Sequence, residues 1–227
     1  MKNCLLFVLL AMTLLPSCRK NDVSMVRQEP RIETGDLLFV GIPMNYGEED
    51  MAQAIADATS DGGDISFIHT AILEVDETGK EWVIDATIAY GVDRHPLDTL
   101  LSQFTLHRGG AKATFEVMRL ADNRDAKQYV EQAKGMLGEE YDLHFLPSNG
   151  KHYCTELVYD LYVKPDGSHH FDCVPMNFKN AEGEMPAYWT RLFGQLGMDV
   201  PQGEPGTNPQ QMHSAPNLVH VMYLDRQ

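Results

Sequence analysis

The sequence is poor in basic residues and in cysteine, and it has only one long hydrophobic run. Lys and Arg number 18 against 33 Asp and Glu, which gives a formal net charge of −15. Because a surface that binds nucleic acid needs clustered positive charge, we expect no nucleic-acid partner. The hydrophobic run, Leu5 to Leu15, is too short to cross a bilayer stably. The remaining residues are enough for one domain with a proper core.

The hydrophobic run belongs to an amino-terminal segment that is typical of a secretory signal peptide. Lys2 precedes the run, and small residues lead from it to Cys18. The ending LLPSC resembles the bacterial lipobox, in which the cysteine becomes the first mature residue and carries the lipid. We therefore expect a signal peptide at residues 1–17, a lipid-anchored tether at 18–30 and a single domain at 31–227. An ordinary signal peptide cut nearby, with Cys18 incidental, is the alternative.

The expected anchor predicts a location in the bacterial cell envelope, on a membrane and facing the periplasm or the exterior. Several acyl chains on Cys18 give near-permanent attachment, since each buried methylene contributes about 0.8 kcal/mol. Without Lys2, the mature chain has 17 basic and 33 acidic residues, a formal charge of −16. The predicted partners are thus a membrane, through the lipid, and a substrate.

The cysteines are too few for a disulfide framework. Of the four, Cys4 leaves with the signal peptide and Cys18 carries the lipid, so Cys154 and Cys173 remain. A bridge between these two is an open alternative in an oxidising compartment, and it would block any chemistry at Cys154.

The sequence also lacks recognisable metal and phosphate motifs, so we expect no metal and no cofactor. His152 lies two residues before Cys154, and a His-His-Phe-Asp-Cys segment occupies 169–173, but paired zinc spacing is missing. We interpret 169–173 as a polar surface loop. Residues 61–64 lack the spaced ligands of a calcium loop, and 109–110 lack a phosphate-loop context.

The hydrophobic pattern predicts an α+β fold with a mainly antiparallel sheet and packed helices. A strong hairpin signal comes from two segments rich in β-branched and aromatic residues, joined by Asp76-Glu77-Thr78-Gly79-Lys80. The Pro/Gly/Gln-rich tail at 200–216 is expected to be an ordered surface loop. Strands are predicted at 37–40, 65–75, 81–89, 114–120 and 218–224, and helices at 48–59, 96–104, 124–137, 153–163 and 186–196.

Cys154 is the candidate nucleophile, because it lies in the first turn of a predicted helix. The unpaired N–H groups at the start of a helix stabilise a thiolate. The alternative is a small buried apolar residue, which is where free cysteines are often found.

His69 and Asp85 are the candidate base and the group that orients it. If the hairpin turn centres on Glu77, positions that sum to 154 face each other, so this pair lies directly opposite on one face of the sheet. A one-residue slip in register would move Asp85 to the other face. The alternatives are a core histidine with one good hydrogen bond and a strand-end carboxylate bonded to backbone.

Five segments together carry a resemblance to a known family. In chain order they are TGDLLFVG, FIHTAILEV, WVIDAT, GEEYDLHFLPSNGKHYCTELVYDLYV and PGTNPQQMHSAPNLVHV. From about Thr34 to Val221 the chain resembles the YiiX-like permuted papain-like amidases of the NlpC superfamily. The resemblance implies a permuted papain-like fold, with the histidine strand before the cysteine helix and the nucleophile at that helix's amino terminus.

The resemblance also implies roles for particular residues. Cys154 takes the nucleophile position, His69 the base, and Asp85 the third polar position, where relatives often have Glu. Tyr153 and Glu156 fall on motif positions and are expected to line the substrate pocket. For Glu156, a helix-stabilising acid near the amino end is the alternative.

The predicted function is therefore a cysteine amidase or peptidase that cleaves an amide bond through a thioacyl-enzyme, with cell-wall peptides as the candidate substrate. The backbone N–H of Cys154 is expected to be one oxyanion donor. Two alternatives remain: a lipid acyltransferase or esterase with the same His-before-Cys order, and a binding module without turnover. A peptide needs polar contacts in the groove, whereas an acyl chain needs an apolar channel.

Overall fold

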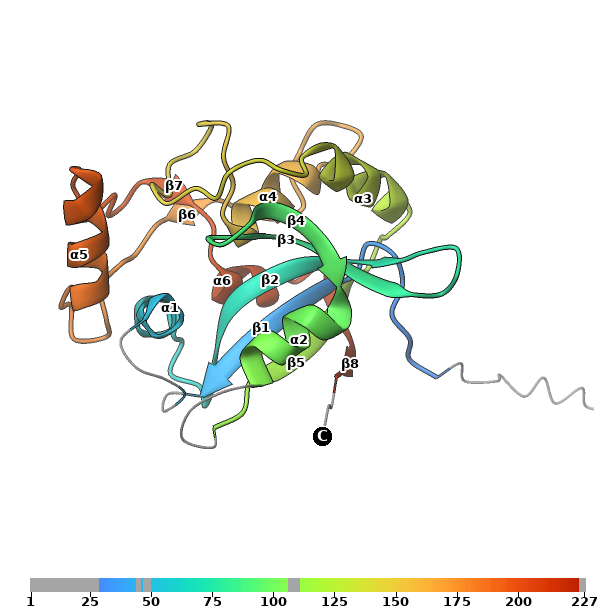
Figure 1. Ribbon diagram of the computed structural model, residues 1–227, viewed down its shortest axis with the longest axis horizontal. Helices are drawn as coiled ribbons and strands as arrows, with labels where there is room; N and C mark the ends of the chain where they lie inside the picture. Colours follow the sequence, from blue (N-terminus) through green and yellow to red (C-terminus); the bar gives the residue numbers. More distant parts are fainter. Residues whose placement is uncertain (1–28, 44–45, 47–49, 106–110, 225–227) are drawn as a thin grey trace, which may run out of the picture.

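Six strands form one antiparallel sheet in the spatial order β4-β3-β2-β1-β5-β8, and two short strands, β6 and β7, pair separately (Figure 1). The computed structural model describes residues 29–43, 46, 50–105 and 111–224, so the predicted signal peptide and Cys18 lie outside the described residues. The strands are β1 Leu37–Pro43, β2 Ile65–Val75, β3 Glu81–Thr87, β4 Gly91–Pro96, β5 Thr114–Leu120, β6 Val174–Pro175, β7 Pro205–Gly206 and β8 Leu218–Tyr223.

Helices cover both faces of the six-stranded sheet. They are α1 Met51–Thr59, α2 Leu97–Thr105, α3 Ala126–Gly135, α4 Cys154–Leu161, α5 Ala187–Leu196 and α6 Pro209–His213. Helices α3, α4 and α6 contribute to the core on one face, and α2 packs on the other. In Figure 1, α1 and α5 lie beyond one end of the sheet, and a third core of aromatic side chains joins them to the segment before α4. Within the described ranges, no helix has the length and hydrophobicity to cross a membrane.

Strand β1 shows why the sheet is buried on both sides. Leu37 and Phe39 join the core with α3 and α4, while Leu38 and Val40 join the core with α2. Successive strand residues point to opposite faces, so the continuous hydrophobic sequence LLFV supplies both cores. Each of these fully buried side chains contributes about 1.5–3 kcal/mol to folding. This strand therefore fixes the centre of the sheet.

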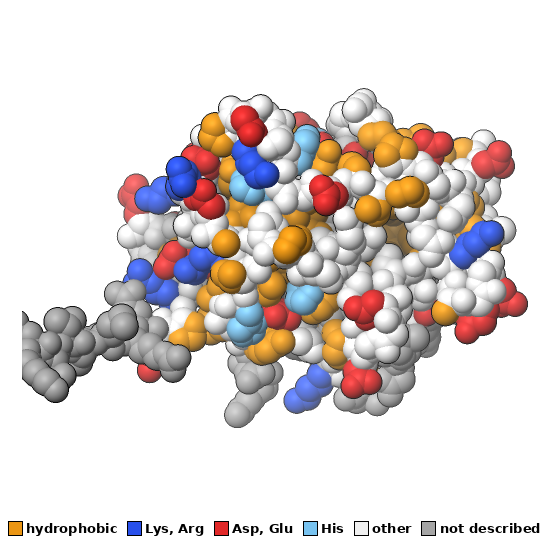
Figure 2. All heavy atoms as spheres, turned by 180° about the vertical axis from the view of Figure 1, so that it is seen from behind, with side chains coloured by type: hydrophobic (Ala, Val, Ile, Leu, Met, Phe, Trp, Pro, Cys, Tyr) orange, Lys and Arg blue, Asp and Glu red, His pale blue; other side chains and the backbone are white. Residues whose placement is uncertain are grey.

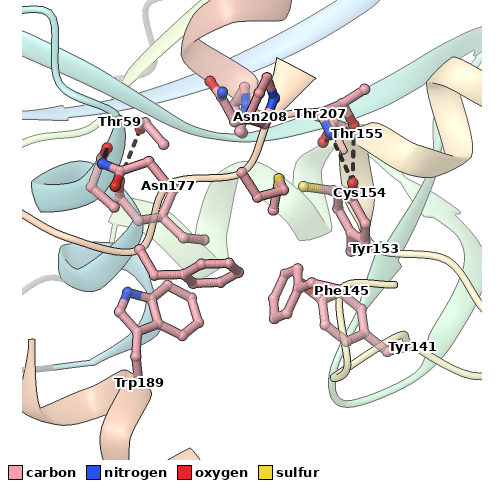
Figure 3. A pocket seen from close by; sticks show the side chains of 16 residues that line it. Thr59, Tyr141, Phe145, Tyr153, Cys154, Thr155, Asn177, Trp189, Thr207 and Asn208 are labelled. Atoms are coloured by element: carbon pink, nitrogen blue, oxygen red, sulfur yellow. Dashed lines mark hydrogen bonds between the residues drawn. The ribbon is translucent and has the colours of Figure 1, made fainter. Parts of the chain in front are cut away.

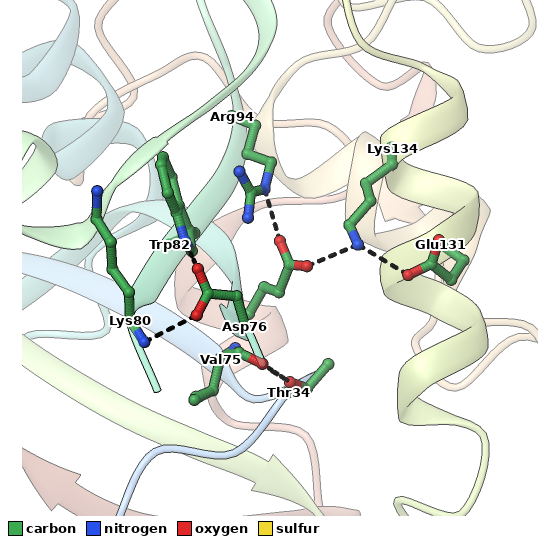
Figure 4. Close-up of polar contacts among 9 residues, drawn as sticks. Thr34, Val75, Asp76, Lys80, Trp82, Arg94, Glu131 and Lys134 are labelled. Carbon is green, nitrogen blue, oxygen red and sulfur yellow. Dashed lines mark hydrogen bonds and ion pairs between the residues drawn. The ribbon is translucent and has the colours of Figure 1, made fainter. Parts of the chain in front are cut away.

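A network of charged residues ties the β2–β3 hairpin to its neighbours (Figure 4). Glu74 of β2 contacts Arg94 of β4 and Lys134 of α3, each at 2.6 Å. The indole N–H of Trp82 donates to Asp76 at 2.8 Å, and the Arg94 guanidinium lies 3.9 Å from the Trp82 ring centre. These contacts hold β4 and α3 in fixed positions against the hairpin, which carries His69 and Asp85.

The molecular face shown in Figure 2 carries interspersed acidic and basic side chains with hydrophobic ones between them. On the described part of this face, acidic side chains separate the positive charges, so there is no continuous basic surface.

The tail at 200–216 differs from the predicted surface loop. Thr207 and Met212 are each 2 % exposed, and residues 209–213 form helix α6. Asn208 caps this helix by accepting from the Gln211 N–H at 2.8 Å, and Pro209 occupies its first position. The prediction was wrong because the composition suggested that the segment is exposed to solvent, whereas helix α6 within it packs against β2. The interpretation of 169–173 as surface also fails at Phe171, which is 5 % exposed.

Candidate functional site

Cys154 lies in the first turn of α4, as predicted, and is its first residue; Figure 3 shows its sulfur pointing into a pocket. Tyr153 precedes it in extended conformation, so the chain turns into the helix at the cysteine. Leu157, Val158 and Leu161 anchor α4 in the core with α3, which fixes where the thiol lies. Cys154 is 6 % exposed and unpaired, and Cys173 is exposed and unpaired, so the alternative of a bridge between them is not present.

His69 reaches the same site from β2 with the help of a bulge. Val40 of β1 pairs with His69, but the next β1 residue, Gly41, pairs with Phe67, so Ile68 is an extra residue in β2. A bulge bends the strand locally and redirects the neighbouring side chains. The backbone N–H of Phe67 donates to the side chain of Gln210 at 2.9 Å, so α6 satisfies a donor at the bulge. The imidazole of His69 lies near Cys154, and both side chains line one pocket.

Asp85 contacts His69 as predicted, although the two are not directly opposite each other. The Asp85 carboxylate lies 2.7 Å from Nε2 of His69. Val75 pairs with Glu81, so the turn centres on Thr78, one residue later than assumed. That difference changes the pairing by two residues, which leaves Asp85 on the same face of the sheet and makes the contact diagonal. Because Nε2 is engaged, Nδ1 is the ring nitrogen left for the thiol.

His95 is a fourth member of this group, and the sequence analysis missed it. Its Nε2 lies 3.0 Å from the second carboxylate oxygen of Asp85. His95 belongs to β4, a strand that was not predicted because its sequence, Gly91 to Pro96, is charged and ends in proline. Asp85 is 2 % exposed and therefore bridges two histidines inside the protein.

The pKa shifts in the group favour the charged forms. Burial alone would raise the pKa of Asp85, but hydrogen bonds from His69 and His95 outweigh it and hold the pKa at about 2. Burial alone would lower the pKa of His69, but the negative charge of Cys154 and the hydrogen bond to Asp85 raise it to about 10. The arrangement is thus that of an imidazolium held by a carboxylate and placed beside the Cys154 thiol.

Two pockets meet at Cys154. The first, here called the aromatic pocket, has a cavity of about 80 Å³ whose walls include Phe145, Tyr153, Met176, Phe178 and Trp189 (Figure 3). The second, here called the histidine-side pocket, has a cavity of about 190 Å³ whose walls include Met51, Ile68, His69, Ile88 and Phe104.

The two pockets share Ile55, Tyr141 and Cys154, which therefore form the ridge between them. Tyr141 was not singled out from the sequence, although it begins the motif YDLHF. Burial and the negative charge of Cys154 raise the pKa of Tyr141 well above its ordinary value, so its hydroxyl stays protonated beside the thiol.

Tyr153 and Glu156, both predicted to line the pocket, are placed differently. Tyr153 lines the aromatic pocket, and its hydroxyl accepts from the Thr207 N–H at 2.9 Å. Glu156 is 6 % exposed, lies outside the described linings of both pockets, and has one carboxylate oxygen without a partner among the described residues. Burial, with the nearby carboxylates of Asp142 and Asp160, raises its pKa to about 8. In the described ranges, no group of three or more His, Cys, Asp or Glu is arranged to hold a metal.

Comparisons with known proteins agree with this architecture. The family of permuted papain-like amidase enzymes, YaeF/YiiX, C92 family, matches residues 31–222. The uncharacterized protein YiiX of Escherichia coli (strain K12) is 26% identical over 192 residues, covering 83% of this chain and 85% of that protein. The crystal structure of metalloprotein yiiX from Escherichia coli O157:H7 has a TM-score of 0.63 at 23% identity, covering 84% of this chain and 96% of that one. The chain therefore belongs to the permuted papain-like amidases of the YaeF/YiiX family.

Proposed function

We propose that this protein is a cysteine hydrolase that cleaves an amide bond, with Cys154 as nucleophile, His69 as base and then acid, and Asp85 as the residue that orients the histidine. The observation that carries the proposal is the position of His69, which lines the same pocket as Cys154 and lies 2.7 Å from Asp85. A nucleophile, a base and an orienting carboxylate in this order are what covalent acyl transfer requires.

The reaction proceeds in two halves. The Cys154 thiolate attacks the amide carbonyl, the C–N bond breaks, and the imidazolium of His69 gives its proton to the departing nitrogen. Water, deprotonated by the now neutral His69, then attacks the thioester and releases the acid and the thiolate. Asp85 remains ionised throughout, because its pKa lies near 2.

Two groups are the candidate donors for the oxyanion that forms on the carbonyl. The first is the backbone N–H of Cys154, which is unpaired because it begins α4. The second is the hydroxyl of Tyr141, a residue that lines both pockets with Cys154 and whose hydroxyl lies 3.9 Å from the sulfur of Met51. A phenol with a raised pKa keeps its proton and donates it as a hydrogen bond to the developing charge.

The lining of the aromatic pocket indicates the acyl group. Its apolar walls favour a compact apolar side chain, and Asn208, which lines the pocket and caps α6 with its side-chain oxygen, has a side-chain NH₂ group that can donate to a peptide carbonyl. This combination favours an amidase or peptidase over an esterase for long acyl chains. Peptides of the cell wall are a substrate class consistent with the predicted envelope location.

We further propose that the mature protein is a lipoprotein of the cell envelope, anchored to a membrane through Cys18. The support is the lipobox-like sequence before Cys18. The domain then works close to the membrane surface on a short tether of residues 18–30.

Labelling with a thiol-directed probe between pH 5 and pH 8 tests the proposal. We expect selective labelling of Cys154 in the wild type, weaker labelling in His69→Ala and none in Cys154→Ser. Cys173→Ser is the matched control, because Cys173 is exposed and lies outside both pockets. Equal labelling of both cysteines, or labelling that ignores His69, would contradict the catalytic assignment and leave a binding module.

A further inference from the structure

One residue that lines only one of the two pockets at Cys154 determines how a bound substrate is oriented. His69 lines the histidine-side pocket and is absent from the described lining of the aromatic pocket. Ile55 and Tyr141 stand between the two, and the thiol is open to both. A bound amide therefore has its carbonyl carbon at the sulfur and one half in each pocket.

The need for proton transfer determines which half of the amide substrate lies in which pocket. The departing nitrogen must come within hydrogen-bond reach of the imidazolium that protonates it. Only the histidine-side pocket offers that position among the described residues. The leaving amine consequently occupies the histidine-side pocket, and the acyl half occupies the aromatic pocket.

We infer that the histidine-side pocket is a leaving-group subsite that selects apolar amines, so that the preferred substrate is an amide with an apolar group on both sides of the scissile bond. This inference rests on the proposed hydrolase function. It adds a substrate class, because the aromatic pocket alone constrains only the acyl half.

The residues that line the histidine-side pocket explain why it would select apolar amines. Met51, Ile68, Ile88 and Phe104 are apolar, and the Phe104 ring stacks on His69 with centroids 6.2 Å apart. Gln103 and Thr87 are polar but uncharged, and apart from His69 no described lining residue is a cation. A carboxylate on the leaving amine would lose water there, and the positive charge of His69 is already paired with Asp85, whereas an alkyl group gains contact.

The step balances without any co-reactant other than water. The C–N bond breaks as the C–S bond forms, and the proton on His69 goes to nitrogen, so a neutral amine leaves through the histidine-side pocket. Water enters the space that the amine vacates and takes its position beside His69 for deacylation.

The experiment uses the mature protein and one fixed acyl group, phenylacetyl, on a series of amines from ethylamine to hexylamine. We expect kcat/KM for amine release to rise roughly two- to four-fold per added methylene until the pocket is filled. The propylamide should react at least about 10-fold faster than the phenylacetyl conjugate of glycine, which has similar size but carries a carboxylate.

Two matched variants distinguish the contributions of the two pockets to substrate preference. Ile88 is 52% exposed in the turn between β3 and β4, so Ile88→Ser should fold normally and flatten the dependence on amine length. Pro175, an exposed residue of the aromatic pocket, provides the control. Pro175→Ser should alter the preference among acyl groups of a fixed propylamide and keep the dependence on amine length.

The outcomes distinguish this inference from the proposed function. Turnover with no dependence on amine length, or a dependence that Pro175→Ser flattens and Ile88→Ser keeps, overturns the leaving-group assignment while the hydrolase stands. No turnover of any amide together with no selective labelling of Cys154 overturns the hydrolase, and the subsite assignment falls with it.

Discussion

At the scale of single residues, the site depends on a carboxylate held by two histidines. Both oxygens of Asp85 are engaged, one by His69 and one by His95. Rotation of the carboxylate would break one of these contacts, so His95 fixes the orientation in which Asp85 meets His69. The short Asp side chain lies 2.7 Å from the histidine ring although the contact is diagonal across the hairpin.

Asp85→Asn should lower kcat/KM by roughly 10²- to 10⁴-fold, because the amide no longer stabilises the imidazolium. The carboxylate contributes to the raised pKa of His69, so its loss lowers that pKa. The high-pH limb of the pH profile of kcat/KM should accordingly move to lower pH. Cys173→Ser, measured in the same way, is the control and should keep the wild-type profile. An unchanged limb in Asp85→Asn would contradict the orienting role.

Tyr141→Phe should reduce kcat by roughly 10- to 10³-fold if its hydroxyl stabilises the oxyanion. Labelling of Cys154 by a thiol probe that forms no oxyanion should stay at the wild-type rate, since the thiolate–imidazolium pair remains. Tyr90→Phe removes a hydroxyl from a residue that is 69% exposed and serves as the control. Full activity in Tyr141→Phe would assign the second donor to another group.

Glu156 is expected to affect stability instead of substrate binding. Its folded-state pKa is raised to about 8, so the unfolded chain releases its proton at lower pH than the folded protein. The resulting loss of stability begins above the ordinary pKa of 4.5 and grows until about pH 8, at about 1.4 kcal/mol per pH unit in the limit.

Glu156→Gln should therefore gain stability over the wild type as the pH rises, on the order of 2 kcal/mol between pH 5 and pH 8. Urea unfolding at both pH values measures this, with exposed Glu182→Gln as the control. A constant difference between variant and wild type, with KM raised in the variant, would instead support contact with substrate.

At the scale of elements, the helices and strands with strong periodicity were predicted to within a few residues. Strand β5 and the hairpin strand β2 have the predicted bounds, and α4 begins one residue after its predicted start. Strand β4 and helix α6 were missed. Their charged residues, prolines and glutamines are typical of exposed loops, whereas their burial depends on contacts with residues far away in the sequence.

The residues of the candidate site also divide into those that the local sequence predicts and those that it does not. Cys154, His69 and Asp85 were predictable because a helix start and a hairpin are local features. His95 and Tyr141 were not, because β4 has no local signal and Tyr141 reaches the thiol only through tertiary packing. The hairpin register was wrong by two residues, yet the conclusion about the shared face survived, because strand side chains repeat every two residues.

Helix α6 has a specific part in holding the histidine strand. Gln210 accepts from the Phe67 N–H and donates to Asp61, each at 2.9 Å. Gln210→Met should destabilise the protein by about 1–3 kcal/mol, because a buried donor at the bulge loses its partner. Gln128→Met, on the exposed side of α3, should leave the unfolding free energy nearly unchanged. Equal stability of the two variants would show that the bulge does not need α6.

At the scale of the whole molecule, one sheet places three distant segments at the same thiol. The hairpin at 65–87 supplies His69 and Asp85, α4 supplies the nucleophile, and the segment at 205–209 supplies a pocket wall. The hairpin lies between β1 and β4 in the sheet. The site is therefore a property of the complete fold.

Membrane attachment is the prediction that belongs to the full-length protein. Cys18→Ala should release the domain from the membrane fraction and abolish incorporation of an alkyne-tagged fatty acid. Cys173→Ser should retain both properties. Labelling that persists in Cys18→Ala would contradict the lipobox assignment, while the catalytic domain would be unaffected.

The aromatic pocket also contains a spectroscopic reporter. The chain has two tryptophans, and they lie in unlike surroundings. Trp82 lies between the charged side chains of Lys80 and Arg94, whereas Trp189 is 2 % exposed in the wall of the aromatic pocket. A Trp82→Phe protein would emit from Trp189 alone. Its fluorescence would then follow the arrival and departure of the acyl group in real time, without any label on the substrate.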